Sequence, residues 1–597
     1  MKHYFTLLLV ITLFTACKND KTTEDNTPTE TLVKNEAFST MLNNFYEEGL
    51  KLNPLSATSA GDNRYNNSLP NTLTDAFSEK EKAYYSDFKA KAESYSNSQL
   101  NAKQQLSRDI LIWDCDINLE RFDFNENYTP INQMWTKQLT VGTLASGASS
   151  QPFNTVEDYD NWLQRVDQYL EWVASAETKM KAGIDNKHVL PKALIAKVVP
   201  QLKTIAETKL EDHLFYTPIK NLPDSFSEQD KTRLTTAYAN MVSNKVIPAY
   251  TSLYNFMKDD YMAAGRTTSG IDDTPNGKAY YEHQIKLYTT TTMTADQIHN
   301  LGLSEVKRIL AEMEKVKTQV GYKGDIISFF DFVRNNKDLT PYNTPKQIID
   351  NFNAIHETMK PQIAKLFDVK PKTAFEVRQT EKFREASASA EYNPGSLDGT
   401  RPGIFYTPIP DATKYNVFSD EALFLHEAIP GHHYQISLQQ EDTELPKFRK
   451  TLWYSAYGEG WALYCESLGK ELGLYTDPYQ YFGMLGMEMH RAIRLVVDTG
   501  MHTKGWTREQ AIKYSLDHEA ESEASIISEI ERYMANPGQA LSYKIGQLKI
   551  MELRAKAEKA LGDRFDIAQF HNQVLEPGCV PLALLETKID QWIEASK

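Results

Sequence analysis

The strongest constraint on the fold is a helical repeat of apolar residues that runs along most of the chain. From Asn35 onward, apolar residues recur at three- and four-residue spacing, which is typical of amphipathic helices. Thr294 is a good N-cap residue, and Asp296 favours the start of a further helix just after it. Strand signals are few, namely an alternating stretch at 375–380 and a short apolar run at 403–407. The sequence therefore predicts a mainly α fold with a small β-sheet. The clearest helical stretches are 37–52, 79–95, 100–122, 156–181 and 192–214.

The composition narrows the class of protein. The hydrophobic content of 41% and the charged content of 24% are ordinary for a globular protein. The formal charge of -15 argues against nucleic acid as a partner, because phosphate binding needs a basic surface. Cys115, Cys465 and Cys579 are few and odd in number, so no disulfide framework is expected.

The N-terminus has the pattern of an export signal. Lys2 precedes an apolar run at 4–14, which is too short to span a bilayer, and small residues then lead to Cys17. This resembles a bacterial lipoprotein signal peptide at 1–16, with Cys17 as the lipidated residue. The alternative is a plain secretory signal that contains a cysteine. Residues 17–35 are polar and predict a flexible tether. We expect an exported protein held to the cell envelope by lipid, on the periplasmic or the surface face.

One short region concentrates groups that bind metals. His426, Glu427, His432 and His433 lie within eight residues, although the chain has only 13 histidines, and Glu459 follows in a helical stretch. Imidazole suits zinc, and a neighbouring glutamate that is not a ligand can act as general base for water. The region predicts a hydrolase that uses one zinc ion, with Glu459 as a ligand and Glu427 as the base.

The spacing of the histidines departs from the common HExxH pattern, in which the two histidines are four residues apart. Pro430 occupies that position here. On a regular helix His432 would lie about 120° around the axis from His426, and His433 would lie about 10.5 Å along it. Pro430 distorts a helix and Gly431 permits unusual backbone angles. A bulge or kink is therefore expected to bring His432 to the metal beside His426, with His433 as the alternative ligand.

A second carboxylate, Glu466, follows Glu459 by seven residues and so lies on nearly the same helix face. One of the two can bind the metal while the other orients a histidine. The alternative is a pair of solvated glutamates on an amphipathic helix. Aromatic neighbours make solvation less attractive, because carboxylates among aromatic rings need partners. These neighbours are Trp453, Tyr454, Tyr457, Trp461 and Tyr464.

Three tyrosines are weaker candidates for the site. Tyr543 or Tyr533 is expected to stabilise the oxyanion that forms during hydrolysis, with structural packing as the alternative for each. Tyr392 and the stretch 399–406 are expected to line the cleft, where a strand can pair with an extended peptide.

Basic residues downstream are candidates for holding a substrate carboxylate. His490 and Arg494 lie one helical turn apart, and arginine binds carboxylates well. The alternative for Arg494 is an ion pair with Asp498, four residues further along the same helix.

Several motifs together resemble the bacterial domain of unknown function eight-eight-five. They are His-Glu-x-x-Pro-Gly-His-His-x-Gln at 426–435, Glu-Gly-Trp-Ala at 459–462, Arg-Tyr-x-x-x-Pro-Gly-Gln-Ala-x-x-Tyr at 532–543, and shorter matches at 276–281 and 578–585. The resemblance covers nearly all of the mature chain. The family is grouped with the glutamate-zincin metallopeptidases, which implies a large helical zincin-like fold with two histidines and one glutamate as ligands. On this sequence the implied ligands are His426, His432 and Glu459, and the implied base is Glu427.

We therefore expect the hydrolysis of amide bonds in short or unfolded peptides. Residues 36–270 would form an N-terminal helical region and 271–597 the catalytic region, together one continuous fold around a cleft. One alternative is a metal-dependent hydrolase of small amides or esters, and a substrate screen would separate the two. The other is a non-catalytic binding lipoprotein, which has no need of Glu427 beside His426.

Overall fold

The computed structural model describes residues 33–147, 149–382, 385, 388–397, 399 and 401–597. The predicted signal peptide, Cys17 and most of the predicted tether lie outside these residues. Among the helices that the structure describes, none combines the length and the apolar character needed to cross a bilayer.

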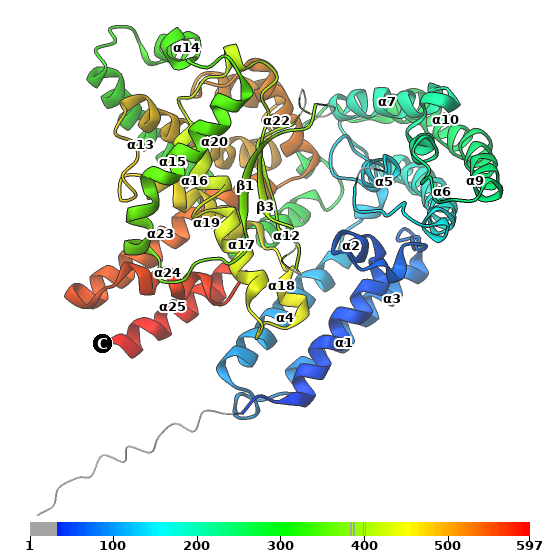
Figure 1. Ribbon diagram of the computed structural model, residues 1–597, viewed down its shortest axis with the longest axis horizontal. Helices are drawn as coiled ribbons and strands as arrows, with labels where there is room; N and C mark the ends of the chain where they lie inside the picture. Colours follow the sequence, from blue (N-terminus) through cyan, green and yellow to red (C-terminus); the bar gives the residue numbers. More distant parts are fainter. Residues whose placement is uncertain (1–32, 148, 383–384, 386–387, 398, 400) are drawn as a thin grey trace, which may run out of the picture.

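The first four helices form a hairpin-like group, drawn in blue in Figure 1. The long helices α3 and α4 pack on each other, and α1 packs on α18 (Lys447–Lys450), far along the chain. Asn35 caps α1, since its side chain accepts a hydrogen bond from the backbone N–H of Phe38 at 3.0 Å. The group comprises α1 (Glu36–Leu52), α2 (Pro54–Ser59), α3 (Asp75–Glu93) and α4 (Ala102–Glu120).

A second group of helices, cyan to green in Figure 1, lies beside the first. Its core holds Trp162, Tyr169 and Tyr250, all nearly or fully buried, and the hydroxyls of the two tyrosines are 2.7 Å apart. The group comprises α5 (Lys137–Ala145), α6 (Val156–Asp185), α7 (Lys192–Glu207), α8 (Thr217–Lys220), α9 (Glu228–Met241), α10 (Ile247–Phe256) and α11 (Met262–Ala264).

The remaining helices form the largest part of the molecule, from green to red in Figure 1. They are α12 (Gly277–Thr289), α13 (Ala295–Gln319), α14 (Ile326–Asn335), α15 (Pro345–Leu366), α16 (Asp420–Glu427), α17 (His432–Glu441), α18, α19 (Ser455–Ser467), α20 (Pro478–Thr503), α21 (Arg508–Leu516), α22 (Glu523–Ala535), α23 (Ser542–Leu561), α24 (Ile567–Leu575) and α25 (Leu582–Ser596). Two close helix pairs, α13 with α20 and α19 with α23, run through this part. Gly460 and Gly546 let α19 and α23 touch, because a Cβ on Gly460 would lie 2.5 Å from the Cα of Gly546.

A three-stranded sheet lies beside α17, as predicted. It consists of β1 (Phe375–Gln379), β2 (Glu391–Asn393) and β3 (Gly403–Thr407), in the order β1-β3-β2. β1 pairs parallel to β3, with Val377 opposite Phe405, and β2 pairs antiparallel to it. The strand β2 has only three residues, too few for its alternation to stand out in the sequence.

The mainly α prediction is confirmed, and most predicted helices agree with the observed ones to within a few residues. Thr294 caps α13 through a reciprocal capping box with Gln297, as its sequence position predicts. The helix predicted to end at residue 214 ends earlier, at Glu207, because Thr208 adopts an extended conformation. One connected cluster of buried apolar side chains reaches from Phe38 to Ile593. The predicted division near residue 270 stays a prediction.

Candidate metal centre

Three helices of the C-terminal part bring two histidines and one glutamate together. His426 lies at the end of α16, His432 begins α17, and Glu459 lies in the first half of α19. Their nearest ligand atoms all lie within 4.8 Å of one another. The Oε2 atom of Glu459 is 3.6 Å from Nε2 of His426 and 3.4 Å from Nε2 of His432. Two imidazole nitrogens and one carboxylate oxygen therefore converge on one point.

The turn between α16 and α17 makes this convergence possible. We expected a kink inside one helix, but α16 ends at Glu427 and a new helix begins at His432. Gly431 packs against the last turn of α16, where a Cβ would lie 1.9 Å from the carbonyl oxygen of His426. A side chain at this position would collide with the backbone. The indole N–H of Trp461 donates to the carbonyl of Pro430 at 2.9 Å and so ties the turn to α19.

Asp420, rather than a capping side chain, holds the start of α16. Ser419 is the N-cap residue, but its side chain makes no capping hydrogen bond. The carboxylate of Asp420 instead accepts hydrogen bonds from Tyr415 at 2.9 Å and from Asn351 at 2.8 Å. These contacts fix the first turn of the helix that carries His426.

The donor set fits zinc. In catalytic zinc sites three protein ligands of the His/Glu type leave one position for water or substrate. Zinc–nitrogen bonds of about 2.0–2.1 Å in a tetrahedral arrangement place neighbouring ligand atoms about 3.3–3.4 Å apart. The distances of 3.4 and 3.6 Å from Glu459 to the two histidines are close to that value.

A second carboxylate orients one histidine. Oε1 of Glu466 lies 2.7 Å from Nδ1 of His426, on the side of the ring away from Glu459. This contact directs Nε2 of His426 towards the convergence point, as carboxylates commonly do behind metal-binding histidines. Burial alone would lower the pKa of His426, but the carboxylates of Glu459 and Glu466 outweigh it and raise the pKa to about 9. Burial would raise the pKa of Glu459, yet the two histidines outweigh it and hold that pKa well below its ordinary value.

His432 is held differently. Its Nδ1 atom is buried and has no hydrogen-bond partner among the described residues. Its ring instead packs at 4.8 Å from the ring of His426 and at 5.8 Å from that of Trp453. Ring packing rather than a hydrogen bond therefore orients the second histidine.

Glu427 is buried beside this group and makes no hydrogen bond or ion pair with another described residue. Burial raises the pKa of its carboxyl group, and the nearby His426 and His432 oppose the rise. A carboxylate with a raised pKa and no protein partner is suited to accept a proton from water.

Arg491 lies near both Glu427 and Tyr543. The guanidinium of Arg491 lowers the pKa of Glu427 as a smaller contribution after burial and the two histidines. Its central carbon lies 6.0 Å from the ring centroid of Tyr543, and its Nε is buried without a partner. The hydroxyl of Tyr543 makes no hydrogen bond to the described residues. The sequence interpretation did not single out Arg491, although it lies next to His490.

The other basic and tyrosine candidates are engaged with one another. Arg494 donates to Tyr533 at 2.9 Å and to Glu529 at 2.9 Å, and Tyr533 donates to Glu529 at 2.7 Å. His490 lies 2.5 Å from Glu519. The ring of Tyr543 covers the guanidinium of Arg494 at 4.5 Å. Nη1 of Arg494 is buried without a hydrogen-bond partner among the described residues, and the role of His490 and Arg494 in holding a substrate carboxylate stays a prediction.

The alternative pairing of Arg494 with Asp498 is wrong. Asp498 accepts instead from the hydroxyl of Tyr281 at 2.5 Å and from the backbone N–H of Gly538 at 3.1 Å. It therefore ties α20 to α12 and to the loop before α23.

His433 and Tyr392 lie together on the side of the sheet. The hydroxyl of Tyr392 in β2 is 2.9 Å from Nδ1 of His433, and the His433 ring packs at 4.9 Å from that of Phe375 in β1. His433 therefore contacts the sheet, whereas His432 is the histidine beside Glu459.

Comparison with known proteins places the chain in a family. It belongs to the family described as "Bacterial protein of unknown function (DUF885)", which matches residues 54–589. A solved structure named "putative lipoprotein" from Colwellia psychrerythraea is similar, with a TM-score of 0.83, 29% identity, and coverage of 94% of this chain and 99% of that one. A second, a "putative lipoprotein of unknown function" from Shewanella oneidensis, shares the fold at a TM-score of 0.72 and 18% identity, covering 92% and 99% of the two chains. No curated protein matches the chain.

Proposed function

We propose that this protein is a zinc-dependent hydrolase that cleaves amide bonds in short or unfolded peptides. The observation that carries the proposal is the convergence of two imidazole nitrogens and one carboxylate oxygen beside a buried, unpartnered glutamate. A site that only binds a metal would have no need of Glu427 at that place.

His426, His432 and Glu459 would hold the ion, and Glu466 would keep His426 in its orientation. A bound zinc ion would lower the pKa of water at the site and polarise the carbonyl of the substrate. Glu427 accepts the proton of the attacking water and then delivers it to the leaving amine.

Tyr543 is the group best suited to donate a hydrogen bond to the developing oxyanion. Its hydroxyl has no partner among the described residues, whereas that of Tyr533 is already bonded to Glu529. Arg494 and Arg491 lie against the Tyr543 ring and fix its position. Such a preorganised donor stabilises charge that appears only in the transition state.

The export prediction belongs to the same proposal. Lipid on Cys17 would attach the enzyme to the cell envelope, where peptides are available as substrates. The names of the two similar solved proteins support this, because both are described as putative lipoproteins.

The proposal is tested by incubating the purified chain with a mixed peptide library, with and without a chelator, and identifying products by mass spectrometry. We expect cleavage that the chelator abolishes and zinc restores, and about one zinc per chain by elemental analysis. A screen of small esters and amides in parallel tests for the alternative hydrolase. The positions of the cleaved bonds distinguish removal of terminal residues from internal cleavage.

The variant Glu427→Gln separates catalysis from metal binding. It should keep its zinc and lose hydrolysis, because Gln cannot accept the proton. Glu523→Gln is the matched control, since Glu523 is exposed in the first turn of α22. Loss of zinc from Glu427→Gln would show that Glu427 binds or supports the metal and has been assigned the wrong role. Unchanged hydrolysis would refute the mechanism.

A further inference from the structure

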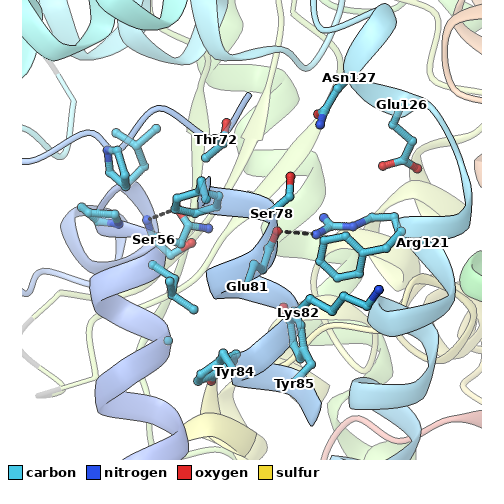
Figure 2. A pocket seen from close by; sticks show the side chains of 18 of the residues that line it. Ser56, Thr72, Ser78, Glu81, Lys82, Tyr84, Tyr85, Arg121, Glu126 and Asn127 are labelled. Carbon is cyan, nitrogen blue, oxygen red and sulfur yellow. Dashed lines mark hydrogen bonds and ion pairs between the residues drawn. The ribbon is translucent and has the colours of Figure 1, made fainter. Parts of the chain in front are cut away.

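A large cavity lies between the first helical group and α18, apart from the metal centre. Its volume is about 1020 Å³, and residues of α1 to α6, together with the stretch 448–452, line it. Figure 2 shows the part of its wall that α3 and the segment 121–127 contribute. None of His426, His432 and Glu459 lines it. The volume is at the upper end of the range of about 300–1,000 Å³ that is usual for small-molecule sites.

Most charged groups in the cavity wall already have partners or face solvent. Arg121 donates to Glu81 at 2.7 Å, a pair marked by a dashed line in Figure 2. Lys179 lies 3.1 Å from Asp75 near the surface. Glu126 accepts from Gln284 at 3.4 Å. The rim residues Glu79 and Lys82 are exposed.

Two charged groups of opposite sign in the wall, Asp114 and Lys137, make no ion pair with a described residue. Asp114 in α4 makes no side-chain hydrogen bond or ion pair with another described residue. Lys137, at the start of α5, donates only to the hydroxyl of Thr72 at 3.1 Å and lies over the ring of Trp172. Burial raises the pKa of Asp114 to about 7, and burial lowers the pKa of Lys137 to about 8 although the negative charge of Glu81 opposes the fall. Charged groups so placed need a compensating partner.

The two groups have different neighbours in the cavity wall, and no ion pair joins them. Lys137 is next to Thr72, which Figure 2 places at the top of the view. Asp114 is near Tyr84 and Tyr85, since it adds to the rise in pKa that burial causes in both, and these tyrosines lie at the bottom of the view. A ligand that reaches both groups must carry a positive charge at one end and a negative charge at the other.

The cavity wall is rich in aromatic rings. Phe122 and Phe124 line it together with Tyr84 and Tyr85. Aromatic faces provide apolar contact area for a side chain while leaving polar groups free to orient the ligand.

We infer that this cavity is a second binding site, which takes an amino acid or short peptide with its free amino group at Asp114 and its free carboxylate at Lys137. The two contacts are charge-assisted hydrogen bonds, which form best where water is partly excluded. Binding here needs no metal and is independent of the proposed hydrolysis.

The cavity and the metal centre share one piece of chain. Thr451 and Leu452 line the cavity, and the next residue, Trp453, packs on His432 at 5.8 Å. The chain therefore passes directly from the wall of the cavity, at Leu452, to a residue that contacts the metal centre, Trp453.

The test is calorimetric titration of the full chain carrying Glu427→Gln with Ala-Phe-Ala, its N-acetyl form and its C-terminal amide. Mass spectrometry verifies that the peptides stay intact. We expect saturable binding of Ala-Phe-Ala before and after treatment with a chelator. Blocking either end should weaken binding about 10-fold or more, because one charge-assisted hydrogen bond is lost.

Variants assign each end of the peptide. In Asp114→Asn the N-acetyl and free peptides should bind alike, and in Lys137→Met the amide and free peptides should bind alike. Asp75→Asn and Lys179→Met are matched controls, because both residues line the cavity but already pair with each other; their affinities should stay within twofold. Circular dichroism checks that every variant is folded.

The inference is overturned if the three peptides bind equally, if neither Asp114→Asn nor Lys137→Met alters their order, or if the chelator abolishes binding. The last result would assign the peptide to the metal centre. Hydrolysis by the unmodified chain is measured separately, so either proposal can fail while the other stands.

Discussion

The metal centre and the N-terminal cavity each contain a carboxyl group largely removed from water, and they treat it in opposite ways. At the metal centre Glu459 lies between two imidazoles, which outweigh burial and hold its pKa well below the ordinary value. In the cavity Asp114 has no partner, and burial raises its pKa to about 7. A pKa shift reports whether the protein itself supplies the compensating charge.

The difference shows which part of each site the protein completes by itself. The metal centre is preorganised: Glu466 holds His426, ring contacts hold His432, and Gly431 sets the turn between them. In the cavity the ring walls are in place, but Asp114 and Lys137 make no ion pair with a described residue. Preorganised groups fix geometry before a ligand arrives, whereas uncompensated groups favour a ligand that brings the missing charge.

Removing the central carboxylate of the metal centre should have the largest effect. Glu459→Gln removes the charge of the carboxylate whose Oε2 lies 3.4 and 3.6 Å from the two histidines, so zinc affinity should fall by more than the roughly 10–100-fold expected for a group that only orients a ligand. Competition with a chromogenic chelator measures the affinity, and Glu523→Gln is the control. A zinc affinity equal to that of the unmodified chain would remove Glu459 from the ligand set.

The orienting carboxylate should have the next largest effect. Glu466→Gln keeps the shape of the side chain but weakens its hold on Nδ1 of His426, and zinc affinity should fall about 10–100-fold. The same competition assay applies. Ser437 is the matched control, because it lies 3.3 Å from Nδ1 of His433, which contacts the sheet rather than Glu459. Ser437→Ala should therefore leave zinc affinity unchanged. Equal effects of the two changes would mean that general packing, and not the orientation of His426, is being measured.

The sequence predicts the helices and the identity of the metal-binding residues better than their arrangement. Long periodic stretches such as 156–181 are reliable because the apolar face of a helix must meet the core. The meeting of His426 with His432 is predicted only through a distortion at Pro430 and Gly431, since a spacing of six residues faces apart on a regular helix. The form of that distortion, one helix ending at Glu427 and another beginning at His432, could not be derived from local sequence.

The cavity left no signal in the sequence. Asp114 stands between Trp113 and Cys115 in an ordinary amphipathic helix, and a carboxylate there reads as part of a solvated face. Its isolation arises only when α3 and the stretch 448–452 pack around it. Such a group becomes visible when tertiary contacts are known, because no local pattern distinguishes it from an exposed aspartate.

The smallest effect, and one whose size depends on pH, is expected at Asp114. An aspartate with a pKa of 3.8 when unfolded and about 7 when folded binds more protons in the folded state between these values. The contribution of Asp114 to the free energy of unfolding therefore falls as the pH rises from about 4 to about 7, and stays low above it. Asn cannot titrate, so Asp114→Asn should be more stable than the unmodified chain at pH 8, by about 1–2 kcal/mol after allowance for the partial contact of this group with water. The gain should shrink at pH 5. Thermal unfolding at both pH values measures it, with Asp75→Asn as the control. A gain that does not depend on pH would mean that Asp114 is not the isolated carboxyl group on which the cavity comparison depends.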